Sequence, residues 1–535
     1  MKKKMIATLL ATVMAIGAMA CGNEAVNSSE STEKVSETTE SKETEVVVEE
    51  PKDPVTITYY FRNTVGEQQY TAQVEEKLNE ILKGIEGYEH ISIDLVPCEK
   101  DYKTAMTLAQ STGAQIDLVS TYNLDFVSMV NDGDFIVLDD LLAEYPEVVS
   151  EVPEWLVDMG KINGEQYMIP TYQQAVNLRY YAIPDEYLAM YTEAKKVTNE
   201  DVRALIQTGT AEEQLDFWED LVTIVREKTG SKTKWLMTND RWPELISNVE
   251  YIQKDGGNML LREGADAPEY WVYTEDYKMI MQRYNEWFKA GLIPMDYATT
   301  TASLKGDDFL NADSQVLDTP KNTASEEYVA EVYSTKVPVT VFQTKDHAYI
   351  PSQYAAGGNA IYADSENPEE CMMIIELLMT KKGEEFYNTL VYGLEGIHYV
   401  WEDKDNNRIK TLEYDGSQGN SSCTYHAMKW NTGNTLNAWK NQAVLDGFLE
   451  YIDEHIHNGE DTVASPVTGI TWDLSSVENQ VAQCQAVDAE YKDVLVSAKD
   501  FDTTYNEYMK KLEAAGVKDI IDCLSKQYND FLASK

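Results

Sequence analysis

The stretch from residue 55 to residue 130 alternates strand with helix, and this alternation restricts the possible folds more than any other feature of the chain. Three short runs typical of strands lie at 55–61, 91–96 and 116–120, and three stretches with helical spacing of apolar residues lie at 70–82, 102–109 and 124–130. Successive strands joined through helices run parallel, with a right-handed connection. The pattern therefore predicts an α/β fold with parallel-type sheets flanked by helices.

Polar and aromatic residues follow two of these predicted strands directly. Arg62 and Asn63 come after the first strand, and Tyr122 and Asn123 come after the third. In open parallel sheets, ligands bind in the crevice outside the carboxyl ends of the strands. We therefore expect these four residues to lie at one edge of the sheet and to form part of a ligand site.

The remainder of the chain is long enough to build a second domain. Roughly 480 of the 535 residues follow the N-terminal region, more than a single hydrophobic core usually contains. We expect a helix over 198–225, a strand at 337–342, a helix opening at Asn367-Pro368, a helix after a capping box at Ser475 and Glu478, and two helices over 501–532 separated at Gly516. The C-terminal part is therefore expected to be largely helical.

The N-terminus has the pattern of an export signal. Three lysines at 2–4 precede an uncharged apolar run at 5–20, which is too short to span a bilayer comfortably and is typical of a secretory signal peptide. Ala18-Met19-Ala20 is a possible cleavage site for ordinary signal peptidase, which would give a secreted protein. The same residues before Cys21 resemble a bacterial lipobox, with Ala18 at the usual position of Leu, Val or Ile. We favour signal peptide 1–20 and a diacylated Cys21.

The composition of the segment that follows Cys21 favours exposure to solvent. Residues 22–54 are rich in Ser, Thr and Glu and contain no aromatic residue. Such a segment buries too little apolar surface to offset the entropy lost on ordering. We expect residues 21–54 to form a disordered acidic tether between a lipid anchor and the folded part.

Composition and missing motifs exclude several functional classes. The chain has 92 acidic and 44 basic residues and a net charge of −48. The protein is therefore a poor partner for nucleic acid. Its negative electrostatic field also disfavours an anionic ligand, unless a local basic pocket outweighs that field. The sequence contains no GxSxG, HExxH or Walker A motif, and its six cysteines follow no metal-like spacing. We expect no cofactor, no metal and no enzymatic activity.

Three short motifs invite a chemical interpretation and are better explained structurally. His455 and His457 are two residues apart, which does not place them on one helix face for a metal. Residues 403–407 (DKDNN) resemble the start of a calcium loop, but Arg408 stands where glycine is required, so we expect a hairpin turn. Glu395 and His398 lie close to Gly393 and Gly396 in a pattern that fits a turn rather than a general acid–base pair.

Four motifs, in order along the chain, resemble those of extracellular solute-binding proteins of ABC transporters. They are residues 131–142 (NDGDFIVLDDLL), 162–170 (INGEQYMIP), 392–399 (YGLEGIHY) and 465–473 (SPVTGITWD). The set is similar to family 1, the maltose-binding-like group, and within it to the Gram-positive lipoprotein branch that carries a C-terminal domain of unknown function. Ile470 and Trp472 stand where that branch usually has Phe.

The resemblance implies a two-lobed periplasmic-binding-protein-like fold of type II. Carried over to this chain, lobe one covers 55–172 with 344–385, and lobe two covers 173–343 with 386–535. The segments 171–177 and 341–355 would cross between the lobes. The ligand would lie in the cleft between the lobes, facing the strand ends that the sheet pattern also selects.

A neutral sugar needs flat aromatic faces for its C–H side and amide, guanidinium or backbone groups for its hydroxyls. The candidate ligand-binding residues are Arg62, Asn63, Tyr122, Asn123, Tyr172, Gln173, Gln174, Asn177, Trp242, Gln353, Tyr354, Trp430 and Trp472. The resemblance implies a monomeric, lipid-anchored receptor on the extracellular face of the membrane, which delivers a sugar or oligosaccharide to ABC permease subunits. A surface-anchored polysaccharide-degrading enzyme and a glycan adhesion module remain as alternatives.

Overall fold

The computed structural model describes residues 52–63, 66–99, 101–173, 179–236, 238, 242–252, 258–297, 326, 338–350, 357–412, 424–442, 444, 462–468, 470 and 472–534. The buried apolar side chains in these residues belong to two sets of chain segments. One set draws on 57–172 and 360–439, and the other on 181–342 and 467–528. The protein is thus a two-lobed α/β fold, as the sequence predicts, and these sets define a first and a second lobe.

The first lobe is built on a five-stranded mixed sheet with the order β2-β1-β3-β13-β6. Its strands are β1 (Val55–Arg62), β2 (Ile91–Cys98), β3 (Leu118–Ser120), β6 (Ile169–Pro170) and β13 (Gly358–Ile361). The predicted parallel unit is confirmed, because β1 pairs in parallel with both β2 and β3. Strand β13 enters from far along the sequence and runs antiparallel to β3 and β6.

The apolar character of β1 follows from burial on both faces of this sheet. Tyr59 belongs to a core on one face, whereas its neighbour Tyr60 belongs to a smaller core on the other face with Tyr102 and Met106. Neighbouring residues of a strand point to opposite faces, so a strand covered on both sides needs apolar residues at nearly every position. This explains why the apolar residues Tyr59, Tyr60 and Phe61 are consecutive, whereas Thr56 and Thr58 alternate with apolar residues earlier in the strand.

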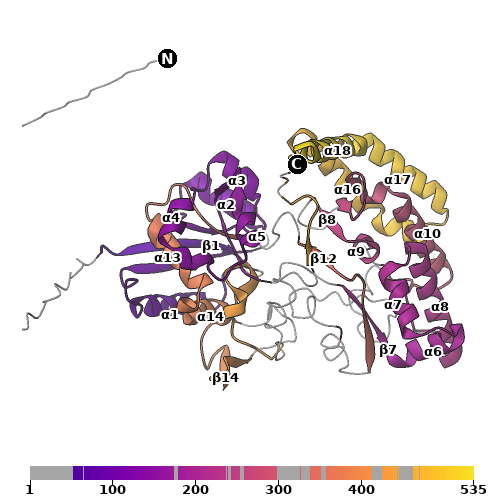
Figure 1. Cartoon of the computed structure of the whole chain (residues 1–535), viewed down its shortest axis with the longest axis horizontal. Helices are drawn as coiled ribbons and strands as arrows, with labels where there is room; N and C mark the ends of the chain where they lie inside the picture. Colours follow the sequence, from indigo (N-terminus) through magenta and orange to yellow (C-terminus); the bar gives the residue numbers. More distant parts are fainter. Residues whose placement is uncertain are drawn as a thin grey trace, which may run out of the picture. The chain divides into compact units, whose positions relative to one another are not determined.

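Helices and short strands complete the first lobe (Figure 1). Helix α1 packs on β2 and α14, and α13 packs on β13. The elements are α1 (Thr71–Lys83), α2 (Tyr102–Thr112), α3 (Phe126–Asp132), α4 (Asp139–Glu144), η1 (Pro146–Val149), α5 (Glu154–Val157), η2 (Asp158–Gly160), β4 (Lys161–Ile162), β5 (Glu165–Gln166), α13 (Pro368–Met379), η5 (Lys381–Gly383), α14 (Glu384–Tyr392), β14 (Tyr399–Asp403), β15 (Arg408–Thr411), η6 (Lys429–Asn431) and η7 (Thr435–Asn437).

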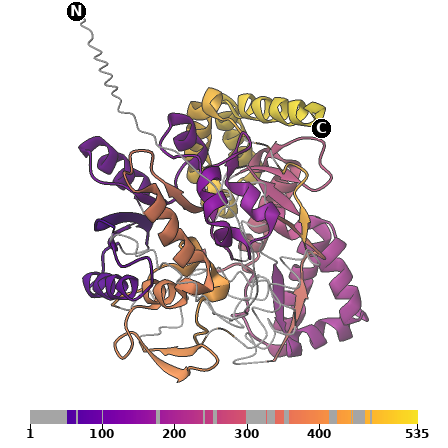
Figure 2. The same cartoon turned by 60° about the vertical axis from the view of Figure 1, so that its left-hand side comes forward.

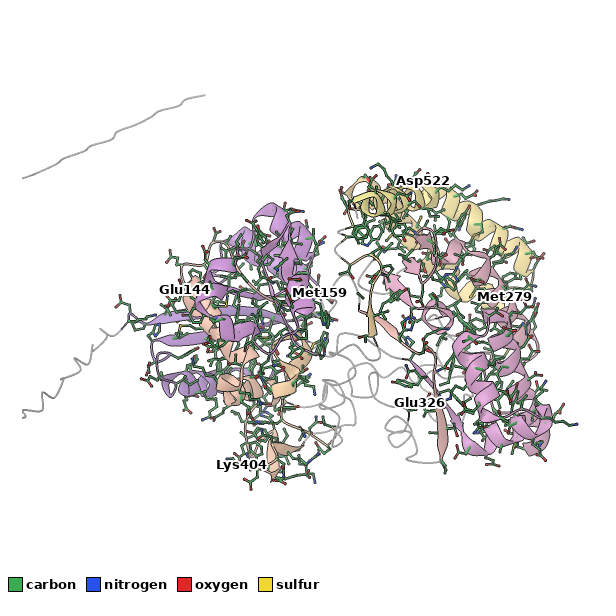
Figure 3. The ribbon with its side chains drawn as sticks, viewed as in Figure 1. Glu144, Met159, Met279, Glu326, Lys404 and Asp522 are labelled. Carbon is green, nitrogen blue, oxygen red and sulfur yellow. The ribbon has the colours of Figure 1, made fainter. Side chains whose placement is uncertain are left out.

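The hairpin of β14 and β15 shows the expected turn at residues 403–407. The Asp403 carboxylate accepts hydrogen bonds from the backbone N–H groups of Asp405 and Asn406, at 3.1 and 3.3 Å. It also accepts one from the Asn406 side chain at 2.7 Å. Lys404, labelled in Figure 3, marks the turn. The carboxylate is thus used to close the loop, as an Asx-type turn does.

The second lobe is mainly helical, with small sheets. Its sheets have the orders β10-β9-β8, β11-β7 and β12-β16, of which only β12-β16 is parallel among the described residues. The elements are β7 (Tyr180–Pro184), α6 (Asp185–Lys195), α7 (Asn199–Thr208), α8 (Ala211–Thr229), α9 (Trp242–Ile246), β8 (Val249–Tyr251), β9 (Met259–Arg262), β10 (Glu269–Tyr270), η3 (Trp271–Tyr273), α10 (Glu275–Lys289), β11 (Val339–Gln343), β12 (Ala348–Ile350), β16 (Thr462–Ala464), η9 (Ser475–Val477), α16 (Glu478–Ser497), α17 (Phe501–Ala515) and α18 (Val517–Ser534).

The structure differs from two predictions about helices in this lobe, and side-chain capping explains both differences. The single helix expected over 198–225 is divided after Thr208, because Thr210 forms a capping box with Glu213 and starts α8 anew. The capping box expected at Ser475 and Glu478 is wrong. The Ser475 N–H instead donates to the Asp473 carboxylate at 2.9 Å, and a short 3₁₀ turn precedes α16.

The chain changes lobe three times within the residues that the structure describes. Tyr172 belongs to the first-lobe core and Tyr181 to the second, Phe342 to the second and Ile361 to the first, and Trp439 to the first and Val467 to the second. The predicted crossing that began at Val341 starts later, because β11 pairs along its whole length with β7 inside the second lobe.

The predicted division of the C-terminal half is also corrected. Residues 386–442 were assigned to the second lobe with the rest of 386–535, but α14 and the segment 424–442 pack in the first-lobe core. Tyr392 and Trp439 stack there at 6.5 Å between ring centroids. Their apolar faces complete the core around α1 and α13. Of the described residues after 442, those from Val467 onward belong to the second-lobe core.

Helices α16, α17 and α18 pack together and end the chain (Figure 1; Figure 2, yellow). The predicted break at Gly516 is confirmed, with φ of 95° at that residue between α17 and α18. A half-buried carboxylate ties these helices to the rest of the lobe, because Asp488 on α16 accepts hydrogen bonds from Tyr270, Tyr508 and the Asn258 side chain, each at 2.6 Å. The helices in the described part of the chain lack the length and apolar character needed to cross a membrane.

Burial raises the pKa of the Asp488 carboxyl above its ordinary value of 3.8, and its three hydrogen bonds oppose that rise. The folded state therefore takes up this proton before the unfolded state as the pH falls. Its contribution to stability is greatest below the unfolded pKa and declines as the pH rises from about 4 toward 7. Asp488→Asn removes this decline.

The melting temperature of Asp488→Asn relative to the natural chain should accordingly rise between about pH 4 and pH 7. Calorimetry across that range measures the difference. Asp522→Asn is the control, since this carboxylate is exposed on α18 (Figure 3). A difference that stays constant with pH for both variants would show that Asp488 titrates alike in the folded and unfolded chain.

Candidate functional site

Several segments bring their ends to one edge of the first-lobe sheet. Strands β1 and β3 are parallel, so Asn63 and Thr121, which follow them, lie at the same carboxyl edge. Strand β13 is antiparallel to β3 and begins there with Gly358, and β6, antiparallel to β13, ends there before Thr171. The Thr121 N–H donates to the Gly358 carbonyl at 2.8 Å. The topology thus gathers residues from four strands at the edge where α/β sheets bind ligands.

An aromatic and cationic group lies at this edge, and we call it the edge platform. The rings of Tyr122 and Trp430 meet edge to face, with 4.5 Å between centroids. The guanidinium carbon of Arg62 lies 5.1 Å from the centre of the Tyr122 ring. All three side chains are half-buried. Flat rings beside a fork of N–H donors can cover a sugar face and bind its oxygens.

The backbone of Trp430 is fixed by hydrogen bonds from the strand ends. The Thr171 hydroxyl donates to the Trp430 carbonyl at 3.0 Å, and the Ser120 hydroxyl donates to the Asn431 carbonyl at 2.9 Å. The Asn431 side chain donates to the Arg62 carbonyl at 3.2 Å. Segment 424–442 is therefore anchored on both sides of the platform, although it has little regular structure of its own.

A second layer of hydrogen bonds lies beneath the platform. Fully buried Asn359 accepts from the Tyr59 hydroxyl at 2.8 Å and donates to the Thr432 carbonyl at 2.9 Å. Asn63 donates to the His426 carbonyl at 2.9 Å. These amide groups satisfy carbonyls of a segment that has little regular structure of its own.

One glycine is required where the chain passes the platform. Gly357 has φ of 69°, and a Cβ placed on it would lie 2.7 Å from the Tyr122 backbone nitrogen and 2.8 Å from the Thr121 hydroxyl. A side chain would therefore separate β13 from the β3 loop. The chain returning from the second lobe can reach β13 beside Tyr122 only because this residue is glycine.

The structure brings together only part of the predicted site. Arg62, Tyr122 and Trp430 form the platform, and half-buried Asn123 follows Tyr122 in a left-handed conformation with φ of 62°. Half-buried Gln173 follows Tyr172 at the end of the described first-lobe segment.

Two other candidates of the first lobe are structural. Asn63 is 1% exposed and its amide is used for the His426 carbonyl. Tyr172 is 3% exposed in the core, and its carbonyl accepts from the Thr435 N–H at 2.7 Å and from the Thr435 hydroxyl at 3.0 Å. Both residues support the edge from below.

Two predicted tryptophans are corrected. Trp242 and Trp472 are buried in the second-lobe core, and the Trp242 indole N–H donates to the Tyr284 hydroxyl. Large aromatic side chains supply much of a core's buried area, and that is what these two do. They are not part of the platform.

The remaining predictions fall outside the described residues. This applies to the candidate ligand residues Gln174, Asn177, Gln353 and Tyr354, to Cys21, and to His455 and His457. Sequence reasoning also missed residues that shape the edge, chiefly Thr171, Asn359 and Asn431. The asparagine-rich run at 431–437 (NTGNTLN) was the available signal, since buried amides commonly satisfy irregular backbone.

The turn at 392–399 is structural rather than catalytic. His398 is buried, and its Nδ1 accepts from the Leu394 N–H at 2.9 Å. Gly393 has φ of 78°, and a Cβ there would lie 2.5 Å from His398 Nδ1. The ring therefore supports the loop and packs against Tyr70 at 5.0 Å. Among the described residues, no group of three or more His, Cys, Asp or Glu side chains is arranged to hold a metal.

Comparison with solved structures identifies the fold. The N-glycan transport solute binding protein NgtS from Streptococcus pneumoniae matches with a TM-score of 0.66 and 19% identity, over 90% of this chain and 99% of that chain. Its complex with Man5GlcNAc matches with a TM-score of 0.58 at the same identity and coverage. The HMO-binding solute binding protein associated with an ABC transporter of Bifidobacterium longum infantis matches with a TM-score of 0.55 and 14% identity, over 90% and 99% of the two chains.

Sequence comparison adds one domain. Residues 466–533, which contain α16, α17 and α18, match the family described as a domain of unknown function, DUF3502. A search of curated proteins finds no match. The structural likenesses show that this chain has the two-lobed fold of ABC-transporter solute-binding proteins, as the sequence motifs predicted.

The buried amide of Asn359 should be essential for the edge. Asn359→Ala leaves the Tyr59 hydroxyl and the Thr432 carbonyl without the amide as partner, which costs about 2–6 kcal/mol of stability because each buried unsatisfied group costs roughly 1–3 kcal/mol. Calorimetry should show a lower melting temperature than for the natural chain. Ser111→Ala, an exposed change on α2, should stay within about 0.5 kcal/mol. Equal melting temperatures for the two variants would contradict a role for Asn359 in holding segment 424–442.

Proposed function

We propose that this protein is a non-catalytic, lipid-anchored receptor on the extracellular face of the bacterial cell membrane. It captures a sugar or oligosaccharide in the cleft between its lobes and delivers it to the permease of an ABC importer. The observation that carries the proposal is the fold, which spans 90% of the chain and is that of solute-binding proteins. The matched NgtS structures include complexes with Man1GlcNAc and Man5GlcNAc, which supports a glycan as the ligand.

The edge platform supports the same ligand class. A sugar ring has one face rich in C–H groups, which the rings of Tyr122 and Trp430 can cover. Its hydroxyls need donors and acceptors, and Arg62, Asn123 and Gln173 lie on the segments around these rings. We propose that Gln174, Asn177, Gln353 and Tyr354, in the connections between the lobes, add further polar contacts.

The three chain crossings support a mechanism based on lobe closure. A ligand that contacts both lobes binds the closed arrangement more tightly than the open one and shifts the population toward it. The closed, monomeric protein is then the species that the permease recognises. No bond of the sugar is broken in this cycle, so the receptor returns unchanged.

A thermal-shift screen of the full chain in detergent against plant and host oligosaccharides tests the proposal. A true ligand should raise the melting temperature with increasing concentration. Trp430→Ala should weaken that ligand about 10- to 100-fold in calorimetric titration, because a central aromatic contact is lost. The matched control is Trp401→Ala, a half-buried tryptophan of the β14–β15 hairpin that packs on Trp439 at 4.6 Å. It should bind as the natural chain does.

Two outcomes would point to other functions. Release of shorter fragments from a bound glycan would indicate a hydrolase. Binding without a change in the radius of gyration, measured by small-angle X-ray scattering, would indicate an adhesion module that does not close.

The anchor has its own test. Cys21→Ala removes the thiol that would be diacylated, so in cells the variant should move from the membrane fraction to the medium. Cys523→Ala, on helix α18, should stay with the membrane. A Cys21→Ala protein that remains membrane-bound would show that the lipid anchor is wrong and would leave the glycan proposal untouched.

A further inference from the structure

Among the residues that the structure describes, every arginine other than Arg62 is committed to partners within the protein. Acidic residues outnumber basic ones 92 to 44, so carboxylates are abundant. In the second lobe four arginines form ion pairs: Arg179 with Glu244, Arg203 with Glu326 (labelled in Figure 3), Arg262 with Glu269 and Asp276, and Arg283 with Asp216 and Glu219. Arg226 and Arg408 donate to backbone carbonyls.

Arg62 differs from all of these. Among the residues that the structure describes, its guanidinium forms no ion pair and no hydrogen bond. The guanidinium carbon lies over the Tyr122 ring, 5.1 Å from the ring centre. Its Nε atom is buried and has no acceptor in the described structure. An unpartnered buried donor calls for an explanation, and an absent ligand is one such explanation.

The position of Arg62 favours a ligand as that partner. The residue ends β1 at the carboxyl edge of the sheet, beside Tyr122 and Trp430. The guanidinium lies over the Tyr122 ring, and its N–H donors form a planar fork. That fork matches the two oxygens of a carboxylate, which accept two parallel charge-assisted hydrogen bonds.

We propose, building on the proposed glycan-binding function, that the natural ligand is an acidic oligosaccharide whose carboxylate is bound by Arg62 next to the Tyr122–Trp430 rings. The carboxylate belongs to a uronic or a sialic acid residue, which share this chemistry.

The net charge of the chain does not oppose this assignment at contact distance. A protein with net charge −48 repels a free anion at long range, but salt screens that repulsion beyond about 8 Å. At contact distance the nearest charge dominates, and there Arg62 faces no carboxylate of the described residues. A neutral ligand would leave this cation uncompensated in a chain rich in acids.

Paired probes test the proposal: glucuronoxylan fragments, pectin fragments and sialyllactose, each used before and after chemical reduction of the carboxyl to an alcohol. Neutral manno-, xylo- and galacto-oligosaccharides complete the panel. The full chain in detergent is titrated with each by calorimetry, together with Arg62→Gln, Arg62→Lys and Lys83→Gln. Lys83 is exposed at the last position of α1 and lies at the opposite edge of the sheet, so its loss changes the net charge equally without touching the platform.

The natural chain and Lys83→Gln should bind one acidic fragment about 10- to 100-fold more tightly than its reduced form, the range expected for charge-assisted hydrogen bonds. Arg62→Gln should bind both forms alike, at the affinity of the reduced form, and Arg62→Lys should recover only part of the preference. Retained affinity for the reduced form also shows that Arg62→Gln is folded.

Other results would overturn the proposal. If a neutral glycan is the tightest ligand of the natural chain, or if Arg62→Gln keeps the preference for the acidic form, the carboxylate assignment is wrong and the glycan function stands. If no glycan of the panel binds, both proposals fail. Whether the pectin, glucuronoxylan or sialyl arm gives the response identifies the acid.

Discussion

The need to satisfy the backbone of segment 424–442 governs the structure of the edge platform in the first lobe. This segment lies against the sheet without belonging to a strand or long helix, and buried carbonyls without partners would be costly. Amide side chains supply the missing bonds. Asn359 reaches it from β13 and Asn388 from α14, where the Asn388 side chain donates to the Asn437 carbonyl at 2.9 Å. The orientation of Trp430 follows from these bonds, so the edge platform depends on residues that lie beneath it.

A different principle holds the second lobe together. Its sheets are small, and its helices are joined through aromatic packing and a few buried or half-buried polar groups. Asp488 is the clearest case, because one carboxylate collects donors from β10, α17 and the residue before β9. The DUF3502 match coincides with these C-terminal helices. They form part of the second-lobe core rather than a separate appendage, since Tyr491, Leu495 and Tyr508 are buried in that same core.

Local periodicity explains which parts of the fold were predictable. The β1–α1–β2–α2–β3 unit, the position of Arg62 and Tyr122 at strand ends, and the break at Gly516 all depend on residues close in sequence. Thr210 and Glu213 form a capping-box pattern that indicates two helices within 198–229. The helical spacing of apolar residues on both sides of Thr210 made the stretch resemble one helix. The assignment of 386–442 to the wrong lobe has a physical cause. The bonds that fix this segment, such as Ser120 to Asn431, join residues 311 positions apart and leave no local pattern. Trp242 and Trp472 show a second limit of sequence-based prediction, since the sequence alone does not distinguish a tryptophan in a core from one on a surface.

The insertion of β13 between β3 and β6 determines when the first lobe can fold. Strand β6 ends at Pro170, and the strand that joins it to the sheet begins at Gly358, about 190 residues later. The ribosome synthesises the chain from its N-terminus, so the first-lobe sheet stays incomplete while most of the second lobe is synthesised. The discontinuous topology thus leaves one edge of β3 unpaired until about two thirds of the chain has been synthesised, since 177 of the 535 residues follow Gly358.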